Sequence, residues 1–532
     1  MLTKRICVLL AVMLILTATF GCGWFGGKRY PGYLRYAIGA EPETVDPRKS
    51  TSIAASIVEA QLFEGLTTLD AANKPLPAAA ERWEVSADGL TYRFYLRPDA
   101  RWSNGQPVTA ADFEYAWKTT LSPELASSYA YQLFYLKNGE AYNQNKVAAD
   151  AVGVRALGEH LLEVALERPT PYFISLVAFH TYYPINRQAA ANEKWAADAR
   201  TVVGNGPFKL ARWVHENKME LAKNEHYWDA VRVRLPRIDI VLVDAASTVL
   251  VMFENRQLDM AENPPISEIP RLEREGKLQI YPFLGVTYYN FNVMRPPFDN
   301  PKVRQAFSLA IDRRTVTERV VRGGQLPALA FVPPGVPDVL PGRDFRATGG
   351  DYLTDNDATA ARRLLAEAGF EGGRGLPPIT LLYNTNESNK AIAEAVQEMW
   401  RKNLGVTVEL ANQEWKVFLD NLEKHNFQVS RDNWIGDYVD PMTFLDLFES
   451  GGGNNSPGYA NPAYDRLLAV ARTARGPGER IAAMHDAEKL LLADAVIAPI
   501  YFNTSSVMIR PNVRGQIRTI LGVVYLKEAY IE

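Results

Sequence analysis

Side chains able to hold a polar ligand are concentrated between residues 431 and 440. The chemistry they offer is binding: charges and aromatic rings for a ligand, with no arrangement for making or breaking bonds. A predicted strand, 427–431, leads into this segment, and loops past the carboxyl ends of strands are where α/β proteins build ligand sites. The alternative is a solvated loop with one structural salt bridge, between Arg431 and Asp437. The residues concerned are Arg431, Trp434, Asp437, Tyr438 and Asp440.

Motifs for catalysis are missing from the sequence. There is no GxSxG nucleophile elbow and no phosphate-binding loop, and Gly204-Asn205-Gly206 continues with Pro207 instead of completing a dinucleotide fingerprint. The six histidines are scattered without an HxxxH pair, and both cysteines lie in the first 22 residues, so we expect no metal and no other cofactor. We therefore expect no enzyme and no catalytic residue. A secreted peptidase is the alternative, which detection of peptide cleavage would support.

The composition is that of a globular chain with several domains. A length of 532 residues exceeds what one hydrophobic core supports, and 47% hydrophobic residues is too high for general disorder. The 58 basic and 61 acidic residues nearly balance, so no basic excess indicates nucleic-acid binding. The 25 tyrosines and 10 tryptophans suit surfaces that hold polar ligands, with core packing as the alternative for each ring.

The N-terminus has the pattern of an export signal. Lys4 and Arg5 precede an apolar run, 6–20, that is short for a membrane span and typical of a cleaved signal peptide. Cys22 follows a small residue at the end of this run, as in lipoprotein signals; an ordinary signal with an incidental cysteine is the alternative. We expect a signal peptide at 1–21, a lipidated tether at 22–33, and a periplasmic or extracytoplasmic protein anchored to the membrane by a lipid on Cys22.

Strands and helices alternate along the rest of the chain, most plainly after residue 300. Thr109 and Asp357 are predicted helix N-caps, and Gly405 is predicted to end a helix that carries Ile392, Val396 and Trp400. The run VIAPIYF, from Val496, is predicted as the final strand. This alternation indicates α/β layers around a largely parallel sheet.

The segment 79–123, AAERWEVSADGLTYRFYLRPDARWSNGQPVTAADFEYAWKTTLSP, resembles the bacterial extracellular solute-binding proteins of oligopeptide and dipeptide importers. It follows that family's order of strand, turn, Trp-Ser-Asn-Gly, Pro-Val-Thr and helix. The resemblance covers essentially the whole chain after residue 33. Further matching runs are VGNGPFKL, NEHYWD, FDNPKVRQAFSLAIDR, LLYNTNESNK, NQEWKVFLD and GNNSPGYANPAYDRLL.

The resemblance implies an α/β protein with the type II periplasmic-binding-protein fold, in which two lobes are joined by a hinge and an extra domain is present. The lobes would close over the ligand by hinge motion, with the crossing chains near Gly285 and Asn503 as hinges. The implied division is domain I at 30–53, 188–284 and 504–532, domain II at 54–187, and domain III at 285–503.

The resemblance also implies which residues bind the ligand. A receptor for arbitrary peptides must hold what all peptides share, namely the α-ammonium, the backbone and the carboxylate. Similar proteins fix the ammonium with a carboxylate in a WxxDY segment, and here that residue is Asp437. The other ligand-binding residues implied are Trp434, Arg431, Trp415, Tyr129, Asn454, Asn263, Glu41, Asn290, Ile435 and Asn433.

The sequence departs from the family pattern at several of these places. A disulfide found in another member is missing, because Gly285 and Ile435 stand at its two positions. Asn290 replaces a glutamate near the ligand. Asn389 and Leu422 replace a histidine and an arginine that catch peptide carboxyl ends, so the preferred peptide length stays open.

The leading hypothesis is the substrate-binding component of an ABC-type importer that captures short oligopeptides. Its partners would be short peptides and the membrane permease subunits, with no nucleic acid, and we expect a monomer. The same fold with a different ligand is the alternative: a murein peptide, a signalling peptide or a non-peptide solute such as a metal or haem complex.

Overall fold

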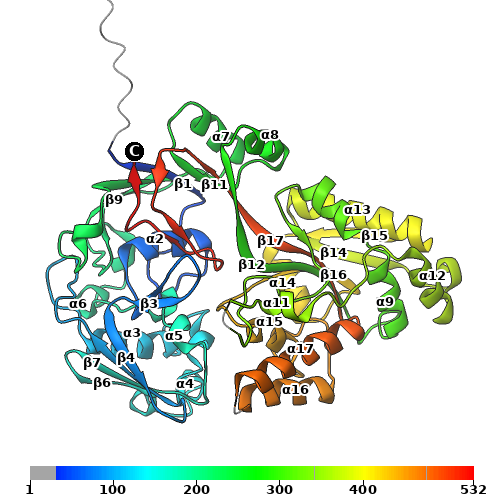
Figure 1. Ribbon diagram of the computed structural model, residues 1–532, viewed down its shortest axis with the longest axis horizontal. Coiled ribbons are helices and arrows are strands. Elements are labelled where there is room, and N and C mark those ends of the chain that lie inside the picture. The colour runs from blue at the N-terminus through cyan, green and yellow to red at the C-terminus, as the bar shows by residue number, and fades with distance from the viewer. Residues whose placement is uncertain (1–31, 341, 475) are drawn as a thin grey trace, which may run out of the picture.

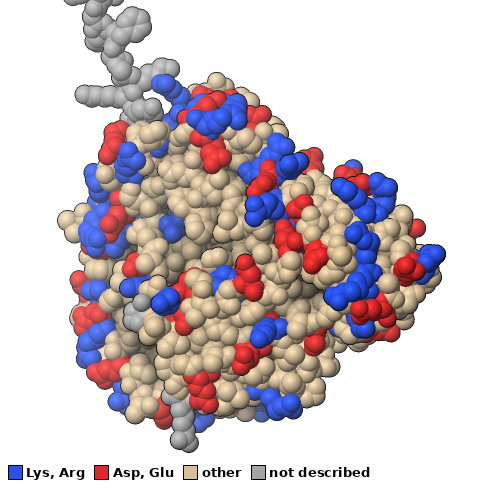
Figure 2. All heavy atoms as spheres, turned by 45° about the vertical axis from the view of Figure 1, so that its right-hand side comes forward, with Lys and Arg blue, Asp and Glu red and all other residues tan. Residues whose placement is uncertain are grey.

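The structure is a computed structural model that describes residues 32–340, 342–474 and 476–532 (Figure 1). Two lobes lie side by side. One holds the first half of the chain together with its C-terminal end, and the other holds most of the second half. The expected signal peptide, Cys22 and most of the expected tether lie outside the described residues. Basic and acidic side chains are interspersed over the face shown in Figure 2.

One 11-stranded sheet passes through both lobes. Its strands are β1 (Leu34–Gly39), β8 (Phe208–Val214), β9 (Lys218–Lys223), β10 (Arg237–Leu242), β11 (Met260–Glu262), β12 (Leu278–Phe291), β13 (Leu326–Pro327), β14 (Ile379–Asn384), β15 (Val408–Gln413), β16 (Val429–Ile435) and β17 (Ile497–Ile509). They lie in the order β15-β14-β16-β12-β17-β11-β1-β10-β9-β8, with β13 paired to β17.

The expectation of a largely parallel sheet was wrong. Pairing is parallel in β1–β10, β1–β11, β14–β15 and β14–β16, whereas β12 pairs antiparallel with both β16 and β17. Strand–helix alternation produces parallel neighbours only where a helix returns the chain to the adjacent strand. The chain instead crosses between the lobes once in each direction, so the two crossing strands are antiparallel to each other.

The two crossing strands, β12 and β17, are interrupted where they pass between the lobes. Pro282 is opposite Thr504 and Val286 is opposite Phe502, so residues 283–285 face a single residue, Asn503. Within this bulge the Leu284 N–H donates to the Ile520 carbonyl at 2.7 Å, and the Leu284 carbonyl accepts from the Gly436 N–H at 2.8 Å. The bulge is therefore held from both sides.

The first lobe also contains a small antiparallel sheet in the order β4-β5-β7-β6, made of β4 (Ala80–Val85), β5 (Thr91–Leu96), β7 (Leu161–Ala165) and β6 (Val154–Gly158). Helix α3 (Ala110–Leu121) packs on it and buries Phe113 and Trp117. Thr109 caps α3 through a capping box with Asp112, which confirms the predicted N-cap.

The second lobe is packed around Trp400. This residue lies on α13 (Glu387–Leu404), is fully buried against Phe307 and Tyr289, and donates its indole N–H to the Phe307 carbonyl at 2.8 Å. The predicted helix end at Gly405 is confirmed. Other helices of this lobe are α9 (Pro301–Leu309), α12 (Ala358–Glu367), whose predicted N-cap Asp357 is confirmed, α16 (Pro462–Thr473) and α17 (Pro477–Ala493).

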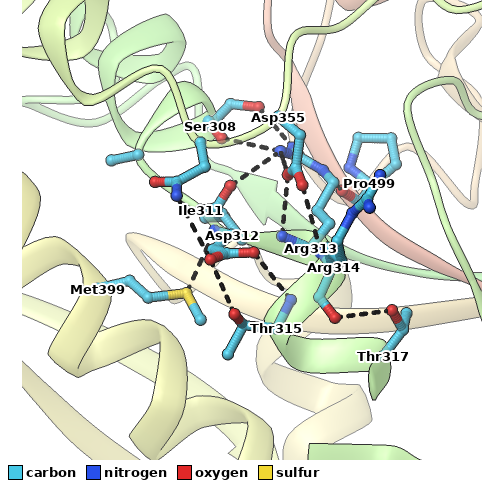
Figure 3. A network of polar contacts seen from close by, with 12 residues as sticks. Ser308, Ile311, Asp312, Arg313, Arg314, Thr315, Thr317, Asp355, Met399 and Pro499 are labelled. Carbon is cyan, nitrogen blue, oxygen red and sulfur yellow. Dashed lines mark hydrogen bonds and ion pairs between the residues drawn. The ribbon is translucent and has the colours of Figure 1, made fainter. Parts of the chain in front are cut away.

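A buried arginine explains the Asp-Arg pair that ends the run FDNPKVRQAFSLAIDR. Arg313 is fully buried and donates to the Pro499 carbonyl of β17 at 2.6 Å and to Ser308 (Figure 3). Asp312 accepts from the Thr315 N–H and so starts the next helical turn. This network ties the end of α9 to the sheet, so its role is structural.

Several short elements complete the fold. The expectation that VIAPIYF is the final strand was wrong, because four two-residue strands follow β17, too short to be recognised from a hydrophobic pattern. None of the helices in the described residues is long and apolar enough to cross a bilayer. The remaining elements include α2 (Ile53–Leu62), β2 (Thr67–Leu69), β3 (Pro75–Pro77), α4 (Gly139–Asn143), α5 (Phe173–Leu176), α6 (Arg187–Ala190), α7 (Ala246–Glu254), α8 (Ile269–Arg274), α10 (Arg313–Thr315), α11 (Phe345–Gly349), α14 (Trp415–Glu423), α15 (Met442–Leu445), β18 (Val513–Arg514), β19 (Ile517–Arg518), β20 (Val524–Tyr525) and β21 (Tyr530–Ile531).

Candidate functional site

The carboxylate of Asp437 lies where the two lobes meet. Gly436 and Asp437 follow directly after β16, and the Asp437 backbone N–H donates to the Thr443 hydroxyl at 3.1 Å, which fixes the turn. From the opposite lobe the Gln132 side chain hydrogen-bonds the Asp437 carboxylate. Burial raises the pKa of Asp437 to about 7, and this hydrogen bond only partly offsets the effect.

Asp437 has no cationic partner in the described part of the chain. Each ion pair recorded within 4.0 Å joins other residues, and Arg431 is not paired with Asp437. The alternative of a solvated loop with an Arg431–Asp437 salt bridge was therefore wrong. A desolvated carboxylate without a cation is costly, and a positively charged ligand would relieve that cost.

Aromatic rings of the first lobe surround this carboxylate. Tyr129 contacts the rings of Tyr131, Phe179 and His180 at centroid distances of 5.7, 5.8 and 5.8 Å. Burial, together with the charge of Asp437, raises the pKa of Tyr129 to about 12 and also raises the pKa of Tyr131. The rings remain neutral hydroxyl-bearing groups at neutral pH, suited to packing around a cationic head group.

The polar residues of β16 face the neighbouring strands. The Asn433 side-chain oxygen accepts from Thr287 at 3.0 Å and from Asn503 at 2.6 Å, which joins β16, β12 and β17 beside the bulge. The Arg431 guanidinium donates to the Asn384 side chain at 3.4 Å, and Asn389 donates to the same oxygen at 2.9 Å. Asn389 is thus linked to Arg431 through Asn384.

Trp434 and Asn290 lie on the other face of the sheet. The Trp434 ring is partly buried, and its buried indole N–H has no hydrogen-bond partner in the described residues. Asn290 is fully buried and donates to the Asp432 carboxylate at 2.8 Å, while its own side-chain oxygen is unpaired among the described residues. Burial raises the pKa of Asp432.

Four other predicted residues make no recorded contact with this cluster in the described part of the chain. Trp415 begins α14, is 50% exposed and stacks on Phe418 at 5.9 Å, with no recorded ring contact to Trp434 in the described residues. Glu41 accepts from the indole N–H of Trp213 at 2.7 Å and from His215, so its carboxylate is occupied in joining two loops. The remaining two, Asn263 and Asn454, are exposed on loops.

A model of one protein family matches residues 74–456, that of the bacterial extracellular solute-binding proteins, family 5, middle region. The chain belongs to family 5 of the bacterial extracellular solute-binding proteins. The resemblance seen in the sequence is confirmed.

Relatives of this family 5 protein match it along almost its whole length. It is 39% identical to the oligopeptide-binding protein OppA of Bacillus subtilis (strain 168), over 98% of this chain and 99% of that protein. The Escherichia coli murein tripeptide-binding protein MppA superposes with a TM-score of 0.80 at 34% identity, covering 94% of this chain and 98% of MppA. Haemophilus influenzae OppA in complex with the peptide RPPGFSPFR superposes with a TM-score of 0.77 at 31% identity, covering 94% of this chain and 100% of that OppA chain.

The expected fold of this family 5 protein is confirmed: it is an α/β protein with the two-lobed architecture of the periplasmic peptide-binding proteins. Gly285 and Ile435, which the resemblance implies are the positions of a disulfide in another member, are opposite each other on β12 and β16. Because the Gly436 N–H bonds the Leu284 carbonyl just outside them, they form a pair without mutual hydrogen bonds, in which the two Cα atoms lie close together.

Sequence reasoning missed several residues that surround Asp437. Gln132, Tyr131 and Glu43 were not singled out, although Glu43 lies near enough to act electrostatically on Tyr129. The available signal was the tyrosine-rich run SSYAYQLFYL from Ser127. Its ring density was visible, but its position opposite Asp437 depends on how the two lobes meet.

Proposed function

We propose that this family 5 protein captures short peptides outside the cytoplasm and delivers them, as the substrate-binding component, to an ATP-driven importer in the membrane. The observation that carries the proposal is the carboxylate of Asp437, which is desolvated between two lobes without a cationic partner in the described residues. A peptide α-ammonium supplies the missing charge. The names of the relatives support this ligand class, since they include an oligopeptide-binding protein and a complex with a peptide.

The peptide backbone would lie beside residues 431–435 of β16, on the side where β14, paired with β16 only at Val429 and Ser430, leaves the strand open. Its side chains would extend toward Trp434 and Trp415. Arg431, Asn433 and Ile435 are alternate residues of β16, and the strand leads toward Asp437. A peptide whose ammonium is at Asp437 would therefore extend beside these residues. Asn290 would support the site indirectly, because it lies on the opposite face of the sheet and hydrogen-bonds the Asp432 carboxylate. Glu41, Asn263, Asn454 and Tyr129 belong to the proposed rim of the site.

Binding calorimetry with tri-alanine tests the proposal. The wild-type protein is expected to bind with a Kd of about 1 μM or tighter, equivalent to about −8 kcal/mol. N-acetylated tri-alanine and the variant Asp437→Asn should each weaken binding by about 30-fold or more, because breaking a buried charge pair costs about 2–5 kcal/mol. The matched control is Asp446→Asn, which removes a neighbouring buried carboxylate and should retain binding. Equal affinity of wild type and Asp437→Asn would contradict the assignment.

The natural ligand is identified by mass spectrometry of small molecules released from the purified protein. Short peptides of mixed sequence support a general peptide receptor. If the released ligand is a single murein peptide, a single signalling peptide or a non-peptide solute, the same fold serves that alternative ligand and the general peptide receptor is ruled out.

The domain assignment fits this mechanism. We place domain I at 30–53, 188–284 and 504–532, domain II at 54–187, and domain III at 285–503, with hinges at Gly285 and Asn503. The bulge of β12 opposite Asn503 supports these positions, because interrupted pairing lets two strands bend together. Closure would bring the Tyr129 segment of domain II onto Asp437 of domain III.

The membrane anchor is proposed at Cys22. In cells fed an alkyne fatty acid, the wild-type protein should become labelled and sediment with membranes. Cys22→Ser should be unlabelled and released, whereas Cys7→Ser should behave as wild type. If Cys22→Ser is still labelled, Cys22 is not the site of lipid attachment.

A further inference from the structure

A cavity of about 360 Å³ lies inside the first lobe, away from Asp437. It is enclosed by the end of α2 and the segment after it, the β2–β3 hairpin, residues 227–232, and residues 517–528 near the C-terminus. None of these segments contains Tyr129, Gln132 or the loop after β16, so the cavity is distinct from the proposed peptide site. At roughly 30 Å³ per water molecule, it has room for about twelve waters or one small organic molecule.

Aromatic rings form much of the wall. The fully buried Phe63 is among the lining residues, as are Tyr183, Trp228 and Tyr525. Burial raises the pKa of both tyrosines, so their hydroxyls stay protonated and can donate hydrogen bonds at neutral pH. Such a wall accepts the flat or apolar body of a ligand.

Most charged groups around the cavity already have partners. The Glu64 carboxylate accepts from the Tyr227 hydroxyl and from the Trp228 indole N–H, the latter at 2.8 Å. Lys527 pairs with Asp229 at 2.8 Å. The other lining pair is Arg232 with Glu528. The two ion pairs are neutral, whereas the Glu64 carboxylate is bonded to neutral donors and feels the charges of Lys527 and Arg97. Asp70, also in the lining, accepts from the backbone N–H groups of Ala72 and Lys74.

Arg97 is the exception. Its Nε donates to the Ala78 carbonyl at 2.6 Å and its guanidinium lies over the Trp228 ring, with 3.8 Å between its central carbon and the ring centroid. No carboxylate lies within ion-pair distance of it among the described residues, although its charge acts on the more distant Glu64 carboxylate. No hydrogen bond is recorded for its two terminal nitrogens in that part of the chain. The guanidinium is thus held in place by stacking and one hydrogen bond, with its fork left open.

We propose that this cavity binds a small organic acid with a ring: its carboxylate pairs with the guanidinium fork of Arg97, and its ring packs against Tyr183, Tyr525 and Trp228. A planar two-oxygen head group matches the fork, and the prior fixation of Arg97 lowers the entropy lost on binding. An ammonium head group placed at the fork would be repelled by Arg97.

The probes for the test are phenylacetate, 3-phenylpropionate and indole-3-acetate, each compared with its neutral amide. Calorimetry on the full mature chain is expected to show saturable binding of at least one acid, with its amide about tenfold weaker or more, since a charged hydrogen-bonded pair contributes about 1.5–3 kcal/mol. Arg97→Gln should weaken the acid to the level of the amide. Absence of binding by all three acids, or equal binding of acid and amide, overturns the proposal.

Two further measurements guard against unfolding of the Arg97 variant and against binding elsewhere. Leu76→Trp places a larger side chain on the 44%-exposed Leu76 of the cavity lining and should block the acids while leaving tri-alanine affinity unchanged. Crystals soaked with 4-bromophenylacetate should show the anomalous bromine signal inside the cavity. A signal only between the lobes, or acid binding unaffected by Leu76→Trp, contradicts the assignment.

Discussion

The rings of Tyr172 and Tyr438 stack in parallel across the two lobes, with centroids 4.1 Å apart and planes at 4°. Tyr172 precedes α5 in the first lobe, and Tyr438 follows the proposed ammonium-binding residue Asp437 in the second. Tyr135 joins them edge-on and donates its hydroxyl hydrogen to the Tyr438 hydroxyl at 3.3 Å. The proposed ligand recognition and the contact between the lobes therefore involve adjacent residues, 437 and 438.

Loss of this stack should weaken peptide binding without touching the ligand. Tyr172→Leu keeps apolar volume but removes the ring, and a stacked aromatic pair contributes about 0.5–1.5 kcal/mol. If the stack forms only in the closed state, the Kd for tri-alanine should rise by about two- to tenfold. Tyr172→Phe retains the ring and should bind as wild type. Calorimetry measures both, and indistinguishable Kd values for the Leu and Phe variants would show that the stack does not stabilise closure.

Peptide affinity should fall on acidification. Burial holds the pKa of Asp437 at about 7, and only the ionised carboxylate can pair with an ammonium. Gln132, Tyr129 and Tyr131 face it from the other lobe and stay neutral in this range, whereas Asp446 also has its pKa raised to about 7. We expect the Kd for tri-alanine to rise about tenfold or more from pH 7.5 to pH 5.5. Calorimetry in two buffers of different ionisation enthalpy should detect proton release on binding at pH 6.5. The control Asp446→Asn should keep this pH dependence, and a wild-type Kd that is constant over this range contradicts the prediction.

The stability of the ligand-free protein should respond to pH in the opposite direction. Asp437 has a folded pKa of about 7 and an unfolded pKa near 3.9, so the folded state binds its proton more tightly. The resulting stability is fully present below about pH 4 and is lost as the pH rises through about 7. Asp437→Asn removes the buried charge and should raise Tm relative to wild type at pH 8, and by a smaller amount at pH 5, which is only about one unit above the unfolded pKa. Calorimetric melting without ligand measures the difference, and an equal effect of the substitution at both pH values would exclude this origin.

A bidentate ion pair supports the loop that carries Asp437 and Tyr438. Arg480 of α17 contacts both carboxylate oxygens of Asp440, at 2.7 and 2.8 Å, and both side chains are nearly buried. Asp440 also accepts from the Met442 N–H and so begins α15. Arg480→Met should leave a buried charge unpaired and lower the free energy of unfolding by about 3–5 kcal/mol.

A double-mutant cycle checks that reading of the Arg480–Asp440 pair. The double variant Arg480→Met with Asp440→Asn should be less destabilised than Arg480→Met alone, because no unpaired carboxylate remains. Urea denaturation followed by circular dichroism gives the four values. Strictly additive changes would mean that the two side chains do not interact in solution.

The two positions of the missing disulfide should accept one. Gly285 and Ile435 are opposite each other as a pair without mutual hydrogen bonds, where Cα atoms are about 4.5 Å apart. A Cβ on residue 285 would lie 2.8 Å from the Asn503 side-chain nitrogen, so this flexible amide must turn aside. Gly285→Cys with Ile435→Cys should form the bond in air, seen as a loss of two mass units and of free thiols. Gly285→Cys with Asn433→Cys is the offset control, and equal oxidation of both would contradict the register.

Local signals predicted the local structure well. Thr109, Asp357 and Gly405 were identified as helix ends, because a cap depends on a few neighbouring residues. The direction of the strands was predicted wrongly, because the antiparallel pairing of β12 with β17 joins segments about 200 residues apart, and no hydrophobic period encodes it.

The contrast between local signals and long-range arrangement also applies to the candidate site. Asp437 was selected from a motif, and the structure places it at the meeting of the lobes without a cationic partner in the described residues. Glu41 was selected in the same way, yet its carboxylate is engaged by Trp213 and His215 from the β8–β9 hairpin. Of the residues that face Asp437 from the other lobe, Tyr129 was selected through the resemblance, whereas Tyr131 and Gln132 could not be, since only the tertiary arrangement brings them to it.

The passage of β12 and β17 through both lobes has a mechanical consequence. Lobes joined only by a surface contact could separate by losing that contact, but here two hydrogen-bonded strands run from one lobe into the other. Separation of the lobes must therefore bend these two strands. The bend is expected at the bulge, where residues 283–285 face Asn503 and the pairing of the strands is interrupted. The resistance to this bending is then set by the few backbone hydrogen bonds at Leu284. The energy needed to open the two lobes thus depends on a segment that does not contact the proposed ammonium site.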